Sequence, residues 1–287
     1  MPELPEVETV RRMLESSVLG RTVRSARISG LKLRSRVPAE LPARLRGRTI
    51  ESLGRHGKYL LIGFDRGLTL LSHLGMSGRW LYFPDAGDRS LDHVHARLVL
   101  VGGGALWFQD PRRFGLLRIV ETAKLARDAS LRRLGPDPVT TPLAGEALHE
   151  IAHGSRQAIK TFLLDQRRLA GIGNIYASEI LFRSGVDPRR MAGRLSRAEW
   201  DRVASDTRQV LEEAIRGMGT TFSAYRTLWG EPGSYGERLL VYDRPGEPCR
   251  RCGSPIRRIV QGQRSTFFCA VCQGPRPRSA PRSRRLG

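Results

Sequence analysis

The chain opens with Met1-Pro2-Glu3-Leu4-Pro5-Glu6-Val7-Glu8, and the rest of the sequence is organised around this stretch. If Met1 is removed, as a small second residue permits, Pro2 carries a free secondary amine beside the carboxylates of Glu3 and Glu6. A terminal amine titrates at about pH 8, so part of it is neutral at physiological pH and can act as a nucleophile. The iminium that it forms is an electron sink. The plainer interpretation is a helix start, because Pro5 suits a first helical position and carboxylates complement the helix dipole.

The apolar pattern then changes from helical to strand-like. Val7, Val10 and Leu14 recur at helical spacing, and Gly20 can end that helix in a left-handed turn. From about residue 23 to residue 120 the pattern predicts short strands, and the clearest runs lie at 59–62, 68–71, 80–83, 98–101 and 116–120. Gly102-Gly103-Gly104 predicts a hairpin turn. Short strands at such spacing are typical of a β-sandwich or barrel.

Turn-forming residues divide the chain further. Proline, glycine and threonine at 135–142 break the strand pattern and predict a linker behind an N-terminal domain at 1–134. Residues 143–245 are predicted to be helical, with the glycine-rich turn Gly171-Ile172-Gly173-Asn174 and a long helix that begins at a capping box on Ser196. Residues 274–287 form a tail rich in arginine, proline and serine, which its composition predicts to be disordered.

Cysteine spacing predicts a metal site at 246–273. Its two C-x-x-C pairs are Cys249 with Cys252 and Cys269 with Cys272, and the residues between the pairs leave room for a β-hairpin. Four thiolates around one tetrahedral zinc ion leave no open position, so this would be one structural zinc ion. Two disulfides are the alternative, which a reducing compartment disfavours.

The charge balance indicates a polyanionic partner such as nucleic acid. The 49 basic and 28 acidic residues give a net charge of +21, although arginine richness can also reflect genomic base composition. The only lysines are Lys32, Lys58, Lys124 and Lys160. No signal peptide is evident, and no apolar run approaches the roughly 18 residues of a membrane span, so we expect a cytoplasmic protein without membrane contact.

Several motifs together resemble one enzyme family. The stretch from Pro2 to Thr9 resembles the amino terminus of the bacterial formamidopyrimidine-DNA glycosylases, which repair oxidised bases, and 171–179 resembles their helix-two-turns-helix motif nearly residue for residue. The resemblance extends over about residues 1 to 273. It implies a multidomain α+β fold, in which an N-terminal β-sandwich flanked by helices precedes a helix-two-turns-helix domain with a zinc-ribbon β-hairpin.

The resemblance also implies an activity and catalytic residues. The implied activity is removal of 8-oxoguanine and formamidopyrimidines from damaged double-stranded DNA through a Schiff base of Pro2, followed by β,δ-elimination. Glu3 would supply acid/base assistance, and Glu6 would orient this apparatus. Lys58 would donate a proton during β-elimination, and Arg264 would assist δ-elimination. From residue type alone, Lys58 is more simply a solvated turn lysine.

Further residues are implied to contact DNA. Met76 and Phe114 match the wedge that fills the stack vacated by a flipped base, and Arg112 matches the residue that reads the orphaned cytosine. Core packing is the plainer interpretation of the two apolar residues. The other implied DNA contacts are His93, Arg113, Arg156, Lys160, Asn174 and Tyr242, and Arg156 stands where relatives often have lysine. Asn174 is expected to cap a helix whose N-terminus suits a phosphate.

One segment departs from the family pattern. Residues 220–235 match the family's substrate-covering loop at Thr220, Thr221 and Gly233, but the middle carries Tyr225 and Trp229. Two alternatives therefore stay open: an enzyme of the related endonuclease VIII class, which acts on oxidised pyrimidines, and a catalytically silent DNA-binding protein with a zinc ribbon. One chain holds every site needed, so we expect a monomer.

Overall fold

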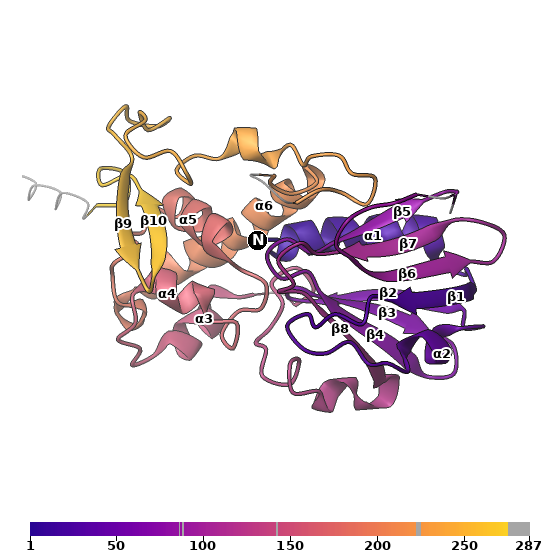
Figure 1. Ribbon diagram of the computed structural model, residues 1–287. Helices are drawn as coiled ribbons and strands as arrows, with labels where there is room; N and C mark the ends of the chain where they lie inside the picture. Colours follow the sequence, from indigo (N-terminus) through magenta and orange to yellow (C-terminus); the bar gives the residue numbers. More distant parts are fainter. Residues whose placement is uncertain (86, 88, 142, 222–224, 275–287) are drawn as a thin grey trace, which may run out of the picture.

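The structure is a computed structural model that describes residues 1–85, 87, 89–141, 143–221 and 225–274. Apart from its first residue, the basic tail expected at 274–287 lies outside these described residues. The described chain forms two units, which Figure 1 shows side by side with the amino terminus at their junction.

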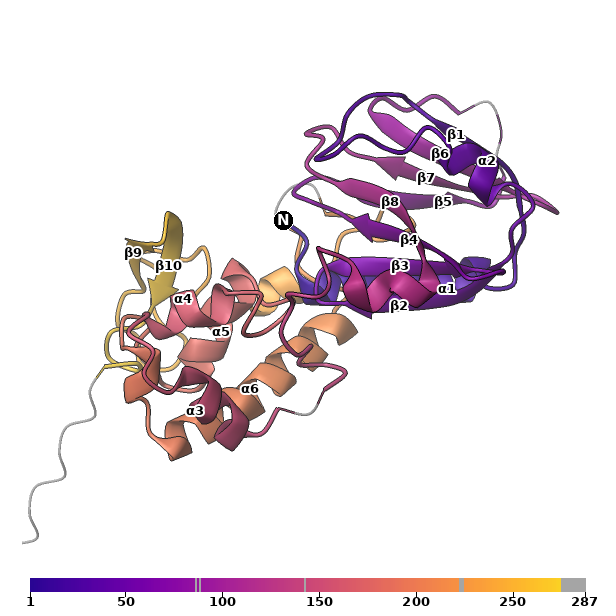
Figure 2. The ribbon, with the colours of Figure 1, turned by 90° about the horizontal axis from the view of Figure 1, so that it is seen from below.

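The N-terminal unit is a sandwich of two antiparallel four-stranded sheets. One sheet has the order β2-β3-β4-β8, and the other has the order β1-β6-β7-β5. Their bounds are Val23–Ile28 for β1, Ile50–His56 for β2, Tyr59–Phe64 for β3, Leu68–His73 for β4, Arg79–Phe83 for β5, Val94–Leu100 for β6, Ala105–Gln109 for β7 and Leu116–Glu121 for β8. Apolar residues of both sheets form one buried cluster between them, which confirms the sandwich. Figure 2 shows the two layers from below.

Local sequence signals account for much of this unit. The helix α1 (Leu4–Val18) has Pro5 in its first turn, and Gly20 follows its end with a φ of 77°, as expected. Gly102 to Gly104 join β6 to β7, where the N–H of Leu100 donates to the carbonyl of Gly104 at 2.9 Å, so the hairpin turn is confirmed. The sequence pattern did not single out β2, which carries few apolar residues, and it did not single out β7, a strand of five buried residues.

The C-terminal unit is helical and ends in a two-stranded hairpin. Its elements are α3 (Gly145–Ala152), α4 (Ile159–Leu164), α5 (Asn174–Arg183), α6 (Arg197–Arg216), β9 (Arg257–Gln261) and β10 (Arg264–Phe268). Short elements complete the chain: α2 (Leu41–Leu45) and the 3-10 turns Thr122–Arg127, Ala192–Arg194 and Tyr235–Arg238. Ser196 Oγ accepts from the N–H of Glu199 at 3.3 Å, so the capping box is confirmed. The N-cap of α5 is Gly173, with Asn174 as the first helical residue, which corrects the expectation of a capping asparagine.

Helix α1 joins the two units. Leu4 packs in the core of the C-terminal unit, whereas Val7, Val10 and Leu14 pack in the core of the sandwich. The N–H of Leu4 donates to the carbonyl of Gly171 at 3.1 Å.

The domain boundaries at 134, 142, 245 and 273 stay predictions. In the part of the chain that the structure describes, no helix is both long enough and apolar enough to cross a membrane.

Candidate active site and DNA-binding surface

The amino terminus of α1 meets the amino terminus of α5. The buried carboxylate of Glu3 accepts hydrogen bonds from the N–H of Ile175 at 3.0 Å and from the N–H of Tyr176 at 3.4 Å. Backbone N–H groups at a helix N-terminus favour a negative charge. A Cβ atom at Gly173 would collide with the Glu3 carboxylate, so glycine is required for this approach. The arrangement fixes the residue that directly follows Pro2.

Glu6 occupies a second buried position behind Glu3. Its carboxylate accepts from the N–H of Glu3 at 2.7 Å, the hydroxyl of Tyr176 at 2.5 Å and the N–H of Thr220 at 2.8 Å. Burial raises the pKa of Glu6, the negative charge of Glu3 adds to this rise, and the three hydrogen bonds oppose it. The contacts to Tyr176 and Thr220 hold the start of α1 from the opposite unit.

Lys58 brings a buried ammonium group to the same place. It lies in the turn between β2 and β3. Burial lowers the pKa of Lys58, Arg264 lowers it further by charge repulsion, and the carboxylates of Glu3 and Glu6 oppose the change. A lysine of lowered pKa can exchange protons near neutral pH more readily than a solvated one. The interpretation of Lys58 as a solvated turn lysine is therefore wrong.

A cavity of about 250 Å³ opens at this junction. Its lining residues are Met1, Glu3, Asn174, Ile175, Tyr242, Asp243 and Arg264. Met1 lines the cavity and is exposed, and the neighbouring Pro2 is buried. The cavity brings together predicted site residues that lie up to 261 positions apart in the chain.

The zinc-finger hairpin is seated on the helical unit by side chains from α4 and α5. Lys160 Nζ donates to the carbonyl of Ser265 at 2.6 Å and to Thr266 Oγ1 at 2.8 Å, and Asn174 Nδ2 donates to the Ser265 carbonyl at 3.0 Å. These bonds hold β10, whose first residue is the exposed Arg264, at the rim of the cavity. The predicted phosphate contacts of Lys160 and Asn174 stay predictions.

Sequence reasoning did not identify Glu179. This buried residue of α5 accepts hydrogen bonds from the N–H groups of Leu240, Val241 and Tyr242 at 2.8, 3.0 and 2.9 Å. It fixes the backbone of Tyr242, whose ring packs edge-on against Phe267 at 5.0 Å. An acidic residue inside an otherwise apolar helix was the signal that could have indicated it.

Two adjacent loops present the predicted wedge. Met76 is 40% exposed and Phe114 is 46% exposed, and the guanidinium of Arg112 lies 5.1 Å from the centre of the Phe114 ring. The exposure excludes the core-packing interpretation of both apolar residues. The buried Asp110, which sequence reasoning also missed, accepts from Ser77 Oγ at 2.6 Å and ties the two loops together.

The remaining predicted DNA contacts lie on the surface. His93 and Arg113 are exposed and have positive φ angles of 60° and 58°. His93 lies next to the wedge loops, because its carbonyl accepts from the N–H of Asp110 at 2.9 Å. Arg156 is exposed in the loop before α4. Their contacts with DNA stay predictions.

The four cysteines gather at the base of the hairpin. All four sulfur atoms lie within 4.8 Å of one another, and the Cys249–Cys272 and Cys252–Cys269 Sγ pairs are 3.8 and 3.5 Å apart. Four sulfurs each about 2.3 Å from a tetrahedral zinc lie about 3.8 Å apart, whereas a disulfide requires about 2.05 Å. All four are free thiols, so the residues fit one structural zinc ion.

Comparisons with known proteins cover most of the chain. Residues 1–117 match the formamidopyrimidine-DNA glycosylase N-terminal domain, 134–225 match the formamidopyrimidine-DNA glycosylase H2TH domain, and 246–274 match the zinc finger found in FPG and IleRS. Formamidopyrimidine-DNA glycosylase of Methylococcus capsulatus is 44% identical over 274 residues, which are 95% of this chain and 100% of that protein.

Solved structures agree with these matches. The MutM (Fpg) protein of Thermus thermophilus is 41% identical, with a TM-score of 0.85 over 96% of this chain and 100% of that one. The Lactococcus lactis Fpg, in complex with DNA that contains an abasic site, is 31% identical, with a TM-score of 0.88 over 95% of this chain and 100% of that one. The sequence resemblance is thereby confirmed, and the chain belongs to the formamidopyrimidine-DNA glycosylase family.

Proposed function

We propose that this protein removes oxidised purines, chiefly 8-oxoguanine and formamidopyrimidines, from damaged double-stranded DNA and then cleaves the strand at the abasic site. Glycosylase and abasic-site lyase activity are general to the family. The observation that carries the proposal is the buried cluster behind the exposed Met1. Pro2, Glu3 and Glu6 are buried, the charges of Glu3 and Glu6 act on the buried Lys58, and Glu3 and Arg264 line the same cavity.

Pro2 is the nucleophile in this proposal. Once Met1 is removed, the Pro2 nitrogen attacks C1′ of the damaged nucleotide, and the oxidised base leaves as the C1′–N bond breaks. Glu3 assists sugar opening and base departure by transferring a proton. The product is an iminium ion between Pro2 and C1′, which withdraws electrons from C2′ and acidifies its hydrogen.

Strand cleavage follows from the same intermediate. Loss of the C2′ proton expels the 3′ phosphate, and a second elimination expels the 5′ phosphate, which leaves a one-nucleotide gap. Lys58 serves as the proton carrier in the first elimination, and its lowered pKa supports that role. Arg264 stabilises the second departing phosphate by charge-assisted hydrogen bonds.

Binding precedes this chemistry. The net charge of +21 collects DNA by releasing its counterions. Met76 and Phe114 fill the space left by the flipped nucleotide, and Arg112 reads the opposite base. Phosphate contacts from His93, Arg113, Arg156, Asn174 and Tyr242 complete the proposed interface. Lys160 is fully buried and donates to Ser265 and Thr266, so its contribution is to hold the hairpin that carries Arg264.

The test is borohydride trapping on labelled duplexes that contain 8-oxoguanine opposite cytosine, thymine glycol, or no damage. We expect a covalent adduct that maps to Pro2 and forms mainly on the 8-oxoguanine duplex. An adduct mainly on thymine glycol would favour the endonuclease VIII class. Binding without adduct or cleavage, by protein with verified removal of Met1, would identify a silent DNA-binding protein.

A Pro2→Gly variant adds a second arm to this test. It should still bind the damaged duplex but excise 8-oxoguanine weakly or by an altered course, because a primary amine replaces the secondary one. Full activity of this variant would refute Pro2 as the nucleophile.

We also propose that the protein acts as a monomer in the cytoplasm. One chain supplies every group at the cavity, and four cysteines placed to hold zinc rather than to form disulfides suit a reducing compartment. A mass from light scattering close to the 32.1 kDa of one chain would support the monomer, and twice that mass would contradict it.

A further inference from the structure

The turn that carries Lys58 is held unusually firmly. His56 at the end of β2 pairs with Tyr59 at the start of β3, so Gly57 and Lys58 alone form the turn. Gly57 has a φ of 56°, and a Cβ atom there would lie 3.0 Å from Ala170 Cβ. The turn is therefore pressed against the loop that precedes α5. A hairpin turn on the surface of a sheet ordinarily lacks such support.

Asp137 and Arg55 hold both peptide groups of Gly57. The N–H of Gly57 donates to Asp137 Oδ2 at 2.8 Å, and Arg55 Nη1 donates to the carbonyl of Gly57 at 3.0 Å. Arg55 and Asp137 also form an ion pair with each other through two nitrogens. Fixing the two peptide groups of Gly57 fixes the backbone from which the Lys58 side chain departs.

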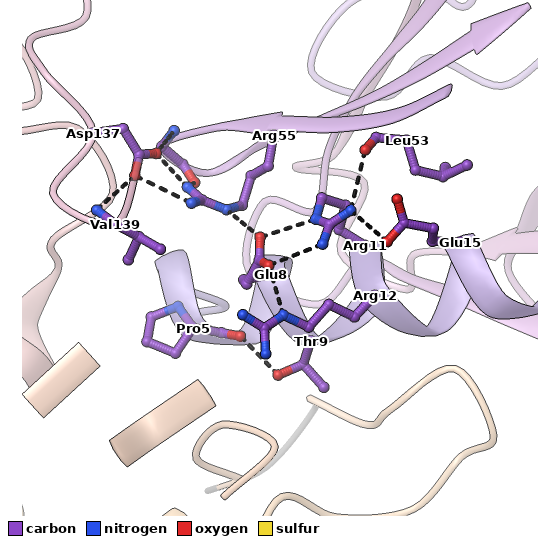
Figure 3. A network of polar contacts seen from close by, with 11 residues as sticks. Pro5, Glu8, Thr9, Arg11, Arg12, Glu15, Leu53, Arg55, Asp137 and Val139 are labelled. Atoms are coloured by element: carbon purple, nitrogen blue, oxygen red, sulfur yellow. Dashed lines mark hydrogen bonds and ion pairs between the residues drawn. The ribbon is translucent and has the colours of Figure 1, made fainter. Parts of the chain in front are cut away.

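The ion pair continues into α1. Arg55 Nε donates to Glu8 Oε2 at 3.0 Å, and Glu8 also accepts from Arg11 and Arg12 (Figure 3). Despite burial, these hydrogen bonds lower the pKa of Glu8 to about 2. The network thus links the helix that carries Pro2 to the turn that carries Lys58.

The buried charges of Arg55 and Asp137 are not explained by a gain in stability. Asp137 is 0% exposed and the Arg55 side chain is 1% exposed, so both charges are fully removed from water. A buried ion pair contributes little net stability, because desolvation offsets the attraction. Geometry is the stronger explanation, since a proton carrier must sit within hydrogen-bond reach of its target.

We propose that Asp137 is a positioning residue for Lys58, acting through Arg55 and the backbone of Gly57. The inference rests on the proposed function, because it concerns the elimination step assigned to Lys58. Asp137 comes from the segment between the two units, so docking of the units and placement of the Lys58 ammonium depend on the same carboxylate.

The test is a double-mutant cycle on β-elimination. The substrate is a duplex with a preformed abasic site, so that base excision does not enter, and the single-turnover rate of strand cleavage is measured with excess zinc-loaded enzyme. The variants are Asp137→Asn, Lys58→Ala and the combination of both. Asp137→Asn keeps the shape of the side chain but removes its charge and one acceptor.

We expect Asp137→Asn to slow cleavage on the order of 10- to 100-fold, the loss typical of a misplaced catalytic group. In the Lys58→Ala background, Asp137→Asn should slow cleavage by less than about twofold more, because the ammonium group that Asp137 positions is absent. Asp137→Glu, which keeps a carboxylate, should recover most of the rate. Glu213→Gln, which breaks the Arg183–Glu213 ion pair in the C-terminal unit, is the matched control and should cleave at the wild-type rate.

Several results would overturn the inference. If Asp137→Asn slows cleavage equally in the wild-type and Lys58→Ala backgrounds, the network affects the reaction through a group other than Lys58. If Asp137→Asn cleaves at the wild-type rate, the network does not affect the elimination. If Asp137→Asn fails to fold, the same cycle with Arg55→Lys decides the matter. A wild-type enzyme that leaves the abasic duplex intact would instead refute the proposed function, so the two failures are distinguishable.

Discussion

Replacement of Lys160 by methionine tests whether this lysine braces the hairpin with a buried charge. Lys160 is 0% exposed, and its ammonium donates to the Ser265 carbonyl and the Thr266 hydroxyl. Burial lowers the pKa of Lys160 from 10.5 to about 8, and the charge of Arg264 contributes to this. At about 1.4 kcal/mol per pH unit, keeping the charged form at pH 7 costs the folded protein about 3 kcal/mol.

The lowered pKa of Lys160 determines how the free energy of unfolding changes with pH. Between pH 8 and 10.5 the unfolded chain still holds the Lys160 proton, whereas the folded chain has released it. Stability rises with pH wherever the unfolded state binds more protons. The free energy of unfolding of the wild type, minus that of Lys160→Met, should therefore rise by about 2.5 kcal/mol between pH 7 and pH 10.

Urea unfolding of zinc-loaded protein at several pH values measures this difference. Other titrating groups, including the zinc thiolates, are common to both proteins and cancel in the subtraction. Lys124→Met is the matched control, because it removes an ammonium that is 66% exposed and paired with Glu121. A difference for Lys160→Met that stays constant from pH 7 to pH 10 would refute a buried ammonium at this position.

Three further predictions concern the interface with DNA. Phe114→Ala should weaken binding to an 8-oxoguanine duplex by about 1–3 kcal/mol, the usual contribution of an aromatic ring stacked on a base. Fluorescence anisotropy measures this binding. Leu19→Ala removes a side chain of nearly equal exposure and should leave the binding unchanged. Chelation of zinc, verified by metal analysis, should abolish DNA binding and strand cleavage together, because the metal holds the hairpin that carries Arg264. Activity retained after zinc loss would contradict a structural zinc. Truncation after Gly274 removes five arginines, so the slope of log affinity against log salt on undamaged duplex should fall by up to about 4.5. An unchanged slope would mean that the tail makes no phosphate contacts.

Local sequence patterns were sufficient for the elements whose signals are local. The capping box at Ser196 and the glycine after α1 marked helix ends correctly, and the spacing of the four cysteines indicated their cluster. Strand β7 was not predicted, although it is a short apolar run that is buried throughout, as is β4, which was predicted.

Buried acids in the site could not be predicted from the sequence. Asp137 lies in a proline-rich stretch that predicts a linker, yet its partner Arg55 is 82 residues away. Asp110 likewise accepts from Ser77, 33 residues away, as well as from the nearby Gly115, and the donors to Glu179 are at least 61 residues away. From residue type alone, an acidic side chain is expected to be exposed to solvent. Only the fold shows which acidic side chains are buried among hydrogen-bond donors.

The same contacts assemble the site and dock the two units. Glu3 receives its N–H donors from α5, and Glu6 receives two of its three from Tyr176 and Thr220, so neither carboxylate is satisfied within the sandwich alone. A buried carboxylate without donors is strongly unfavourable. Separation of the units would therefore remove these donors from both carboxylates and release the start of α1. The catalysis that we propose therefore requires the docked state, since its proposed residues come from both units, from Pro2 to Arg264.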